Sequence, residues 1–510
     1  MTTTLPVGTP TATPAPPAQC RNYIAGRWVD AASGRTFTST NPADTGEVVG
    51  EFPRSDRTDV IAAIDAAKAA YPAWSRVPVP TRADIILRTG ALMEACKEDL
   101  ARLMTREMGK VLEEARGDVQ EGIDMAKYIA GEGRRFFGET VPSELRDKFA
   151  MVIRQPLGVV GLITPWNFPI AIPTWKSFPA LLAGNTVVFK PAEDTPACAT
   201  ALVELMVEAG VPDGVLNLIT GYGEEAGQPM VEDERVRMIS FTGSAGVGRD
   251  VASRAGRHLK KVSLELGGKN PIIVMDDADL DLALEGALWG AFGTSGQRCT
   301  AASRLIVQRG VLDEFTRRLV ERAAHLKVGN GLDPDVDMGP VINRKQLDRI
   351  HSYTDAGVQE GAKLLLGGKI LSGPAYDKGY FYCPTIFGDV NYRMRIAQEE
   401  IFGPTTAIMP VTDYDEAILV ANSVEFGLSS SIYTRDVNRA FHAIHDLESG
   451  IAYVNAPTIG AEIQLPFGGI KGTGNGHREA GTSAIREFTE LKSVYVDYSG
   501  KLQRAQIDTE

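Results

Sequence analysis

Two different hydrophobic patterns divide this chain. Between residues 57 and 130, apolar residues recur at spacings of three and four among Ala, Leu, Glu and Lys, which is the period of amphipathic helices. After residue 158, short apolar runs bounded by turn residues replace that period. These runs predict five strands, at residues 159–164, 186–190, 215–220, 237–242 and 261–266.

Helical segments separate these strands, and such an alternation predicts a parallel, doubly wound sheet. In one of the helices, Thr195 is expected to supply a hydroxyl N-cap, Pro196 begins the helix and Gly210 follows its end. A second alternating series starts with a strand at residues 271–275 and continues to about residue 454. We therefore expect an α/β fold with two doubly wound domains.

The two ends of the chain show other patterns. Residues 1–19 are a low-complexity Thr/Pro/Ala segment that lacks the parts of a signal peptide, so we expect a disordered tail, with an unusual targeting segment as the alternative. Residues 22–37 predict one hairpin, and the glycine-rich residues 468–476 imply no regular structure. Residues 491–499 predict a strand that needs another edge, either a segment such as 150–154 or another subunit.

Composition narrows the possible functions. The 510 residues carry 53 basic and 65 acidic side chains, a net charge of −12, so nothing favours nucleic acid as a partner. No run of about 18 apolar residues occurs, so we expect no membrane span. Five scattered cysteines without a CxxC pair, and only six histidines, argue against a disulfide scaffold and against a metal site. A reducing cytoplasm fits this pattern best.

Two residues are candidates for catalysis by their local sequence. Cys299 lies in FGTSGQRCTAAS, where glycines and Ser295 precede it, and a cysteine on such a turn can present its sulfur and its backbone N–H to a substrate. A small buried core thiol is the alternative. Glu265 lies in LELGGKNP, where a strand runs into two glycines, so it falls at the strand end where ligands bind in open α/β folds. The alternative for Glu265 is a structural cap.

Two further segments have the character of binding loops. Asn167 lies in PWNFP directly after the first strand, so its side-chain amide can donate to an oxyanion, although an ordinary Asx turn is the alternative. FTGSAGVG reads as a strand, a turn and a helix beginning near Ser244, and a helix N-terminus favours phosphate. Its glycine spacing is not GxGxxG, so the common dinucleotide fingerprint is absent.

Seven segments, in this order, resemble motifs of the aldehyde dehydrogenase superfamily. They are PWNFP, VFKPAEDTP, FTGS, LELGGKNP, SGQRCT, EEIFGP and PFGGIKGTG. The resemblance spans about residues 22–499. It implies an NAD(P)-dependent oxidoreductase with a cofactor domain (residues 20–135 and 156–266), a catalytic domain (267–480), a small β oligomerisation element (136–155 and 481–499) and a C-terminal tail (500–510).

The resemblance also implies catalytic roles. Cys299 matches the nucleophile that forms a thiohemiacetal and then a thioester, and Asn167 would hold the oxyanion together with the Cys299 backbone N–H. Glu265 matches the base that activates water, and its presence favours hydrolysis to a free acid over transfer to coenzyme A. Lys176 and Glu479 match positions of a proton path behind Glu265.

For the cofactor, the resemblance places Lys190 and Glu193 at the adenosine ribose. A carboxylate at Glu193 would repel a 2′-phosphate, so we expect NAD to be preferred, with NADP possible. The other expected cofactor contacts are Thr164, Pro165, Trp166, Gly223, Gly243, Ser244, Leu266, Glu400 and Phe402.

The family's substrate funnel corresponds here to Phe168, Ile172, Trp175, Arg298, Thr300, Ile459 and Phe467. Three aromatic side chains favour broad-range aliphatic and aromatic aldehydes as the first hypothesis. Trp175 stands where succinate-semialdehyde members tend to have a carboxylate-binding Arg. Arg298 and Glu121 resemble the pair that meets the carboxylate and amino groups of α-aminoadipate semialdehyde. A carboxylated semialdehyde, α-aminoadipate or ketoglutarate semialdehyde, is therefore the alternative, and a purely structural salt bridge of Arg298 is another.

Two rival classes remain to be separated from an aldehyde dehydrogenase. A cysteine hydrolase would need a histidine beside Cys299, and no triad motif is recognisable. A structural protein built on the same fold is the second rival, although Cys299, Glu265 and Asn167 are all present. The family assembles as homodimers or homotetramers, and the C-terminal tail is expected either to reach a neighbouring subunit or to fray.

Overall fold

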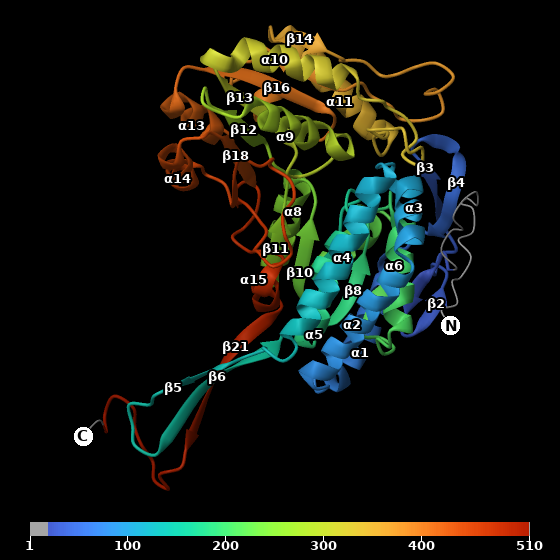
Figure 1. Cartoon of the computed structure of the whole chain (residues 1–510). Helices are drawn as coiled ribbons and strands as arrows, with labels where there is room; N and C mark the ends of the chain where they lie inside the picture. The colour runs from blue at the N-terminus through green and yellow to red at the C-terminus, as the bar shows by residue number, and fades with distance from the viewer. Residues whose placement is uncertain (1–18, 509–510) are drawn as a thin grey trace, which may run out of the picture.

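A computed structural model of the chain describes residues 19–508. It contains two α/β units and an extended arm that leaves them (Figure 1). The expected disordered tail, residues 1–19, lies outside the described residues except for its last position. The expected α/β fold with two mainly parallel sheets is confirmed.

The first sheet has the order β11-β10-β7-β8-β9-β1-β2. All five strands predicted from the apolar runs are present, and they pair in parallel. Their bounds are β7 (Val159–Ile163), β8 (Thr186–Lys190), β9 (Leu216–Leu218), β10 (Val236–Thr242) and β11 (Lys261–Glu265).

The single hairpin predicted for residues 22–37 is wrong. The chain turns at Ala25 and Gly26, both with positive φ (52° and 81°), so β1 (Asn22–Ile24) pairs at once with β2 (Arg27–Val29). Two residues with positive φ make the tight turn that matches strand twist, so no longer loop is needed. Residues after 35 belong to a second pair, β3 (Thr36–Asn41) with β4 (Asp44–Pro53).

Helices cover both faces of this sheet, as a doubly wound fold requires. One layer and its core consist of α2 (Val79–Ala95), α3 (Lys97–Met108), α4 (Leu112–Glu132), α5 (Ala171–Ala183) and α6 (Pro196–Glu208). The other consists of α1 (Arg57–Trp74), η1 (Gly223–Gly227), α7 (Gln228–Glu232) and α8 (Ala245–Gly256).

Helix α6 begins at Pro196 as predicted, but Thr195 does not cap it through its side chain. The Thr195 hydroxyl is buried and makes no hydrogen bond. Instead, the buried carboxylate of Glu107 accepts from the backbone N–H groups of Ala197 and Cys198, at 2.7 and 2.8 Å. A long-range carboxylate thus replaces the local hydroxyl, and its charge also suits the positive end of the helix dipole.

The second sheet has the order β14-β15-β16-β13-β12-β18-β19 and confirms the second alternating series. Its strands are β12 (Asn270–Val274), β13 (Ala302–Gln308), β14 (Lys363–Leu366), β15 (Thr385–Gly388), β16 (Thr405–Val411), β18 (Ser429–Tyr433) and β19 (Ile451–Val454). The helices α9 (Leu280–Phe292) and α10 (Arg309–Ala324) pack on one face. The other face is covered by α11 (Arg344–Gln359), α12 (Arg395–Gln398), α13 (Tyr414–Asn422) and α14 (Val437–Asp446).

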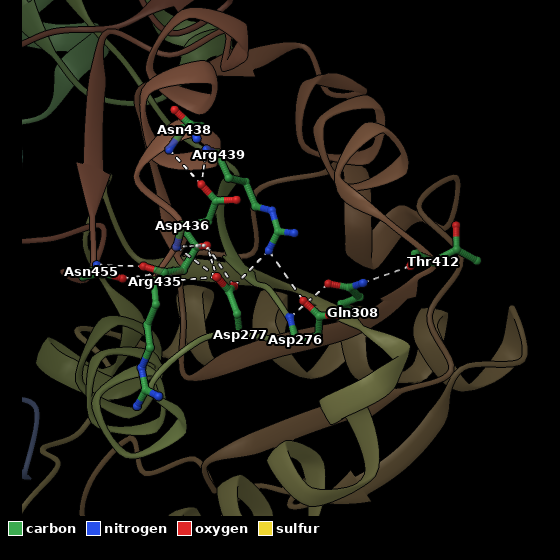
Figure 2. Close-up of polar contacts among 10 residues, drawn as sticks. Asp276, Asp277, Gln308, Thr412, Arg435, Asp436, Asn438, Arg439 and Asn455 are labelled. Carbon is green, nitrogen blue, oxygen red and sulfur yellow. Dashed lines mark hydrogen bonds and ion pairs between the residues drawn. The ribbon is translucent and has the colours of Figure 1, made fainter.

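Asp277 joins several segments by hydrogen bonds at the carboxyl end of the second sheet (Figure 2). Asp277, after β12, accepts from the Thr434 hydroxyl at 2.8 Å, from the backbone N–H groups of Arg435 and Asp436, and from Arg439 at 2.9 Å. These donors lie just after β18 and in α14. Every oxygen of Asp277 is therefore occupied by the protein itself.

The arm consists of β5 (Glu139–Val141), β6 (Lys148–Pro156) and β21 (Thr489–Asp497). β21 pairs antiparallel with β6 along its whole length, with Tyr495 opposite Ala150 (Figure 1). The late strand therefore finds its edge within the chain, the first of the two expected alternatives. The glycine-rich segment departs from expectation slightly, because β20 (Ile470–Lys471) pairs with β17 (Phe426–Gly427). No helix of the described residues is long and apolar enough to cross a membrane.

Candidate active site

Cys299 follows a backbone turn with an uncommon conformation. Thr294, Ser295 and Gly296 have φ values of 53°, 56° and 66°, three consecutive left-handed residues at the end of α9. A Cβ atom on Gly296 would lie 2.1 Å from the carbonyl oxygen of Gly403, so only glycine fits there. The Ser295 hydroxyl donates to the carbonyl oxygen of Gly339 at 2.8 Å and fixes the turn from the other side.

The side chain of Asn167 lies against the same turn. Its amide donates to the carbonyl oxygen of Gln297 at 3.0 Å, and the residue is buried. An amide nitrogen carries two hydrogens, so one N–H remains for a ligand. Burial, followed by the charges of Glu400 and Glu265, raises the pKa of the Cys299 thiol to about 12. The thiol is therefore protonated at neutral pH in this arrangement.

Glu265 ends β11 inside the protein. It is buried, and neither carboxylate oxygen has a hydrogen-bond partner. Burial raises its pKa well above the usual range, the charge of Glu479 raises it further, and Lys176 lowers it. Lys176 forms a buried ion pair with Glu479 and donates to the Ser240 hydroxyl at 2.8 Å. An acid with unfilled oxygens and a raised pKa is suited to exchange a proton near neutral pH.

A cavity of about 170 Å³ opens on one side of Cys299. Of the expected cofactor contacts, its lining includes Pro165, Trp166, Gly243, Ser244, Leu266, Glu400 and Phe402. The rings of Trp166 and Phe402 meet edge to face with centroids 5.4 Å apart. Ser244 caps α8, accepting from the Val247 backbone N–H at 3.4 Å, as the sequence predicts.

The remaining expected cofactor contacts are Thr164, Lys190, Glu193 and Gly223, and they follow or end parallel strands of the first sheet without lining this cavity. Lys190 is buried and pairs with the partly exposed Glu193 at 3.5 Å. Burial lowers the pKa of Lys190. The carboxylate of Glu193 therefore lies just beyond the carboxyl end of β8.

Sequence reasoning missed several residues of this cavity, namely Thr242, Gly267, Gln346 and Arg349. Gln346 donates to the carbonyl oxygen of Phe402 at 2.7 Å, and Arg349 donates to that of Glu400 at 2.7 Å. Their only sequence signal is a spacing of three on a helix, which places both on one face. That spacing alone does not say what the face contacts.

A second cavity, of about 100 Å³, opens on the other side of Cys299. Seven of the expected substrate residues line it: Glu121, Phe168, Ile172, Trp175, Arg298, Thr300 and Phe467. Ile459 is buried and does not line it, whereas its neighbours Gly460 and Ala461 do. Glu265 and Glu479 form part of the same wall, so the expected catalytic and substrate residues meet here.

Arg298 is the basic residue among those that line the second cavity, beside three acidic ones. Its Nε donates to the Thr294 hydroxyl at 2.9 Å, and one terminal nitrogen pairs with Glu114 at 3.2 Å. Its guanidinium also lies 5.4 Å from the centre of the Phe168 ring. A guanidinium has five N–H donors, so these contacts leave donors for a further acceptor. The salt bridge considered from the sequence exists, but it does not use the whole group.

Two other classes of site find no support in the described residues. Between residues 19 and 508 there is no group of three or more side chains suited to hold a metal ion. All six histidines lie in that span, and none lines either cavity. A histidine-dependent cysteine hydrolase therefore lacks its base here.

The α/β fold places a cysteine between two cavities. Comparison with protein families identifies the class of protein to which this arrangement belongs. A model of the aldehyde dehydrogenase family matches residues 28–494. The chain belongs to the aldehyde dehydrogenase family, and it is an enzyme, an oxidoreductase that acts on an aldehyde group.

Similar proteins include several with named substrates. The chain is 44% identical over 475 residues to the alpha-ketoglutaric semialdehyde dehydrogenase of Bacillus subtilis (strain 168), covering 93% of this chain and 97% of that one. It is 43% identical over 474 residues to the succinate-semialdehyde dehydrogenase (NADP(+)) GabD of Escherichia coli (strain K12), covering 93% and 97%. A crystal structure of betaine aldehyde dehydrogenase (betB) from Staphylococcus aureus in complex with NAD+ is 36% identical, with a TM-score of 0.93 and coverage of 95% and 96%.

Proposed function

We propose that this enzyme converts an aldehyde to its carboxylic acid through covalent attachment to Cys299. As the sulfur bonds to the aldehyde carbon, the thiol proton passes to water and the carbonyl oxygen becomes an oxyanion, which the free N–H of Asn167 and the Cys299 backbone N–H stabilise. The chemistry that a bound nicotinamide cofactor supplies is acceptance of a hydride. Cys299 then carries the acyl group as a thioester, Glu265 takes a proton from water, and hydrolysis releases the acid and the thiol. Lys176 and Glu479 serve Glu265 as a path for that proton.

For the substrate, we propose a semialdehyde with a carboxylate at its far end, rather than the broad range of simple aldehydes that the aromatic lining suggests. The observation that carries this proposal is Arg298, a cation in the wall of the substrate cavity with donors left over. The relatives named for ketoglutarate and succinate semialdehyde support it. A charge-assisted contact to a carboxylate contributes about 1.5–3 kcal/mol, which is about 10- to 100-fold in kcat/KM.

The protonation state of Glu121 helps to decide between two carboxylated semialdehydes as the substrate. Burial raises its pKa to about 8, nearby Asp118 raises it as well, and Arg298 and Lys110 lower it. Most of this carboxyl group is therefore neutral at pH 7 and can donate a hydrogen bond to a carbonyl oxygen. A neutral acid is a poor partner for an ammonium group, so this favours ketoglutarate semialdehyde over α-aminoadipate semialdehyde.

The substrate proposal is tested by NADH formation at 340 nm. Ketoglutarate, glutarate and succinate semialdehydes are compared with pentanal and benzaldehyde, in the unaltered enzyme and in Arg298→Ala, with Cys299→Ala as the blank. We expect carboxylated substrates to lead by at least tenfold and Arg298→Ala to remove that lead while pentanal is affected less. If kcat/KM for pentanal equals or exceeds that for the carboxylated semialdehydes, the substrates are simple aldehydes instead.

For the cofactor, we propose a nicotinamide dinucleotide, with NAD preferred over NADP. The first cavity suits it, because the N-terminus of α8 at Ser244 favours phosphate, the rings of Trp166 and Phe402 suit a flat ring, and the half-buried Glu400 suits ribose hydroxyls. Glu193 would repel a 2′-phosphate. The NAD/NADP ratio of kcat/KM should therefore fall about tenfold or more in Glu193→Ser, and an unchanged ratio would contradict the assignment.

For the assembly, we propose a homodimer or homotetramer formed through the arm. β21 and β19 are both edge strands, so each has one unpaired backbone edge. Large apolar side chains in the arm or just before it, including Phe137, Leu491 and Tyr495, are exposed at 66–68%. Light scattering of the purified chain, compared with Leu491→Lys, tests this, and a monomer in both samples would refute it.

A further inference from the structure

Three acidic residues of α4 lie on one face of the helix, and each contacts or lines a part of the protein near the candidate active site. Glu114, Asp118 and Glu121 are spaced by four and three residues, the spacing of one helix face. Glu121 lines the substrate cavity. Asp118 accepts from the backbone N–H of Ala171, at the start of α5, at 2.7 Å, and pairs with the buried Lys110 at 2.9 Å. Glu121 thus borders the substrate cavity, and Asp118 holds the start of α5, the helix that follows Asn167.

Glu114 is the member of this face that reaches the nucleophile turn. Its two carboxylate oxygens accept from the backbone N–H of Thr294 at 2.8 and 3.0 Å. One of them also pairs with Arg298 at 3.2 Å, and Arg298 in turn donates to the Thr294 hydroxyl. Glu114, Thr294 and Arg298 therefore form a closed triangle across 180 residues of sequence.

The turn needs such support because its conformation is strained. Thr294 is β-branched, and both it and Ser295 have positive φ, where a non-glycine residue costs roughly 1–3 kcal/mol. Such residues persist only where their surroundings hold them. The Ser295 hydroxyl holds one side of the turn through Gly339, and Glu114 holds the backbone on the other side.

We propose that Glu114 is a positioning residue of the reaction, which holds the strained turn so that the Cys299 sulfur faces the junction of the two cavities. This rests on the proposed role of Cys299 as the nucleophile. A carboxylate suits the task because its two oxygens serve a backbone N–H and a guanidinium at once. A glutamine retains one acceptor oxygen, and an alanine retains none.

The experiment compares Glu114→Ala, Glu114→Gln and the control Glu113→Ala. Glu113 is the adjacent residue of the same helix, its side chain is 87% exposed, and it forms an ion pair with Arg116 at the surface. Two readouts are measured: kcat and KM with pentanal, and the rate at which iodoacetamide alkylates Cys299 without cofactor, located by peptide mass. Pentanal lacks a carboxylate, so its kinetics do not depend on a contact between Arg298 and a substrate carboxylate.

We expect Glu114→Ala to lower kcat about 10- to 100-fold, since displacement of a reacting group by about 1 Å costs that much, while KM changes less than threefold. Glu114→Gln should retain part of the rate, and Glu113→Ala should stay within twofold. The alkylation rate of Cys299 should change in the same order. If Glu114→Ala does not fold, Glu114→Gln with a normal melting temperature carries the test.

The outcomes separate this proposal from the function on which it rests. Inactive Cys299→Ala together with Glu114 variants that keep kcat and the alkylation rate within twofold would overturn the positioning role alone. Turnover in Cys299→Ala would overturn the covalent function itself. A fall in melting temperature with unchanged kcat would make Glu114 a structural residue only.

Discussion

The two seven-stranded sheets contribute to the active site from opposite ends of their strands. In the first sheet, Asn167 and Ser244, which line the first cavity, follow the carboxyl ends of β7 and β10. In the second sheet, Cys299 and Glu400 precede the amino ends of β13 and β16. The carboxyl end of a parallel sheet is the ordinary ligand side of an α/β fold, so the second sheet reverses the rule.

The carboxyl end of the second sheet and the junction of the two sheets also differ in how their carboxylates are used. At that carboxyl end, Asp277 accepts from Thr434, from two backbone N–H groups and from Arg439, so its oxygens are filled by the protein (Figure 2). At the junction of the sheets, Glu265 has both oxygens unfilled. The contrast shows that a carboxylate at a strand end indicates a site only when its hydrogen-bonding capacity is left over.

From this comparison of the two sheets, we expect the largest loss of activity when Glu265 is substituted. In Glu265→Gln, steady-state turnover should fall about 10²- to 10⁴-fold, because the amide cannot take a proton from water. Formation of the thioester does not need this base, so a rapid burst of NADH should remain. Stopped-flow absorbance at 340 nm measures both phases, and steady-state turnover within tenfold of the unaltered enzyme would disprove the role.

A stability effect of similar size is expected where a buried charge loses its partner. Asp118 and Lys110 form an ion pair with side-chain exposures of 0% and 1%. Asp118→Ala leaves the ammonium unpaired, so the free energy of unfolding should fall by about 3–5 kcal/mol. Urea titration measures this, with the exposed Glu113→Ala as control, and a loss below about 1 kcal/mol would show that the pair is dispensable.

At the carboxyl end of the second sheet, a substitution should lower the stability of the protein without lowering its activity. Asp277→Ala removes an acceptor of several hydrogen bonds and should lower the free energy of unfolding by about 1–3 kcal/mol. Since Asp277 lies at the end away from Cys299, kcat/KM of the folded enzyme should remain within twofold. A large loss of kcat/KM without a loss of stability would mean that this end of the sheet also serves the reaction.

The smallest effect concerns the charge around the thiol. Burial first, and then Glu400 and Glu265, raise the pKa of Cys299 to about 12, so the thiolate fraction should still increase about tenfold per pH unit above pH 9. An unperturbed thiol, with a pKa near 8.5, would level off there. Glu400→Gln removes one negative charge, lowers this pKa and should increase the alkylation rate at pH 8 a few-fold. A pH profile of alkylation that levels off near pH 8.5 would contradict the raised pKa.

The sequence predicts the parts of this molecule that are encoded by neighbouring residues. The five apolar runs predict the strands of the first sheet, and motifs resembling those of a family predict that Cys299, Asn167 and Glu265 meet. The cap of α6 was predicted wrongly because Glu107 reaches Ala197 from 90 residues away. Glu114, Gln346 and Arg349 were missed for the same reason: a local pattern assigns a helix face but not the element that it contacts.

The pairing of β21 with β6 has a consequence for the order in which the protein can be made. β6 leaves the ribosome long before β21, which supplies its partner more than 330 residues later. Phe467 and Glu479, two walls of the substrate cavity, also come from this last part of the chain. A nascent chain therefore has an exposed strand edge and an open cavity, a state prone to aggregation, until residues 467–497 have been made. Catalytic competence therefore requires the same late segment that completes the arm.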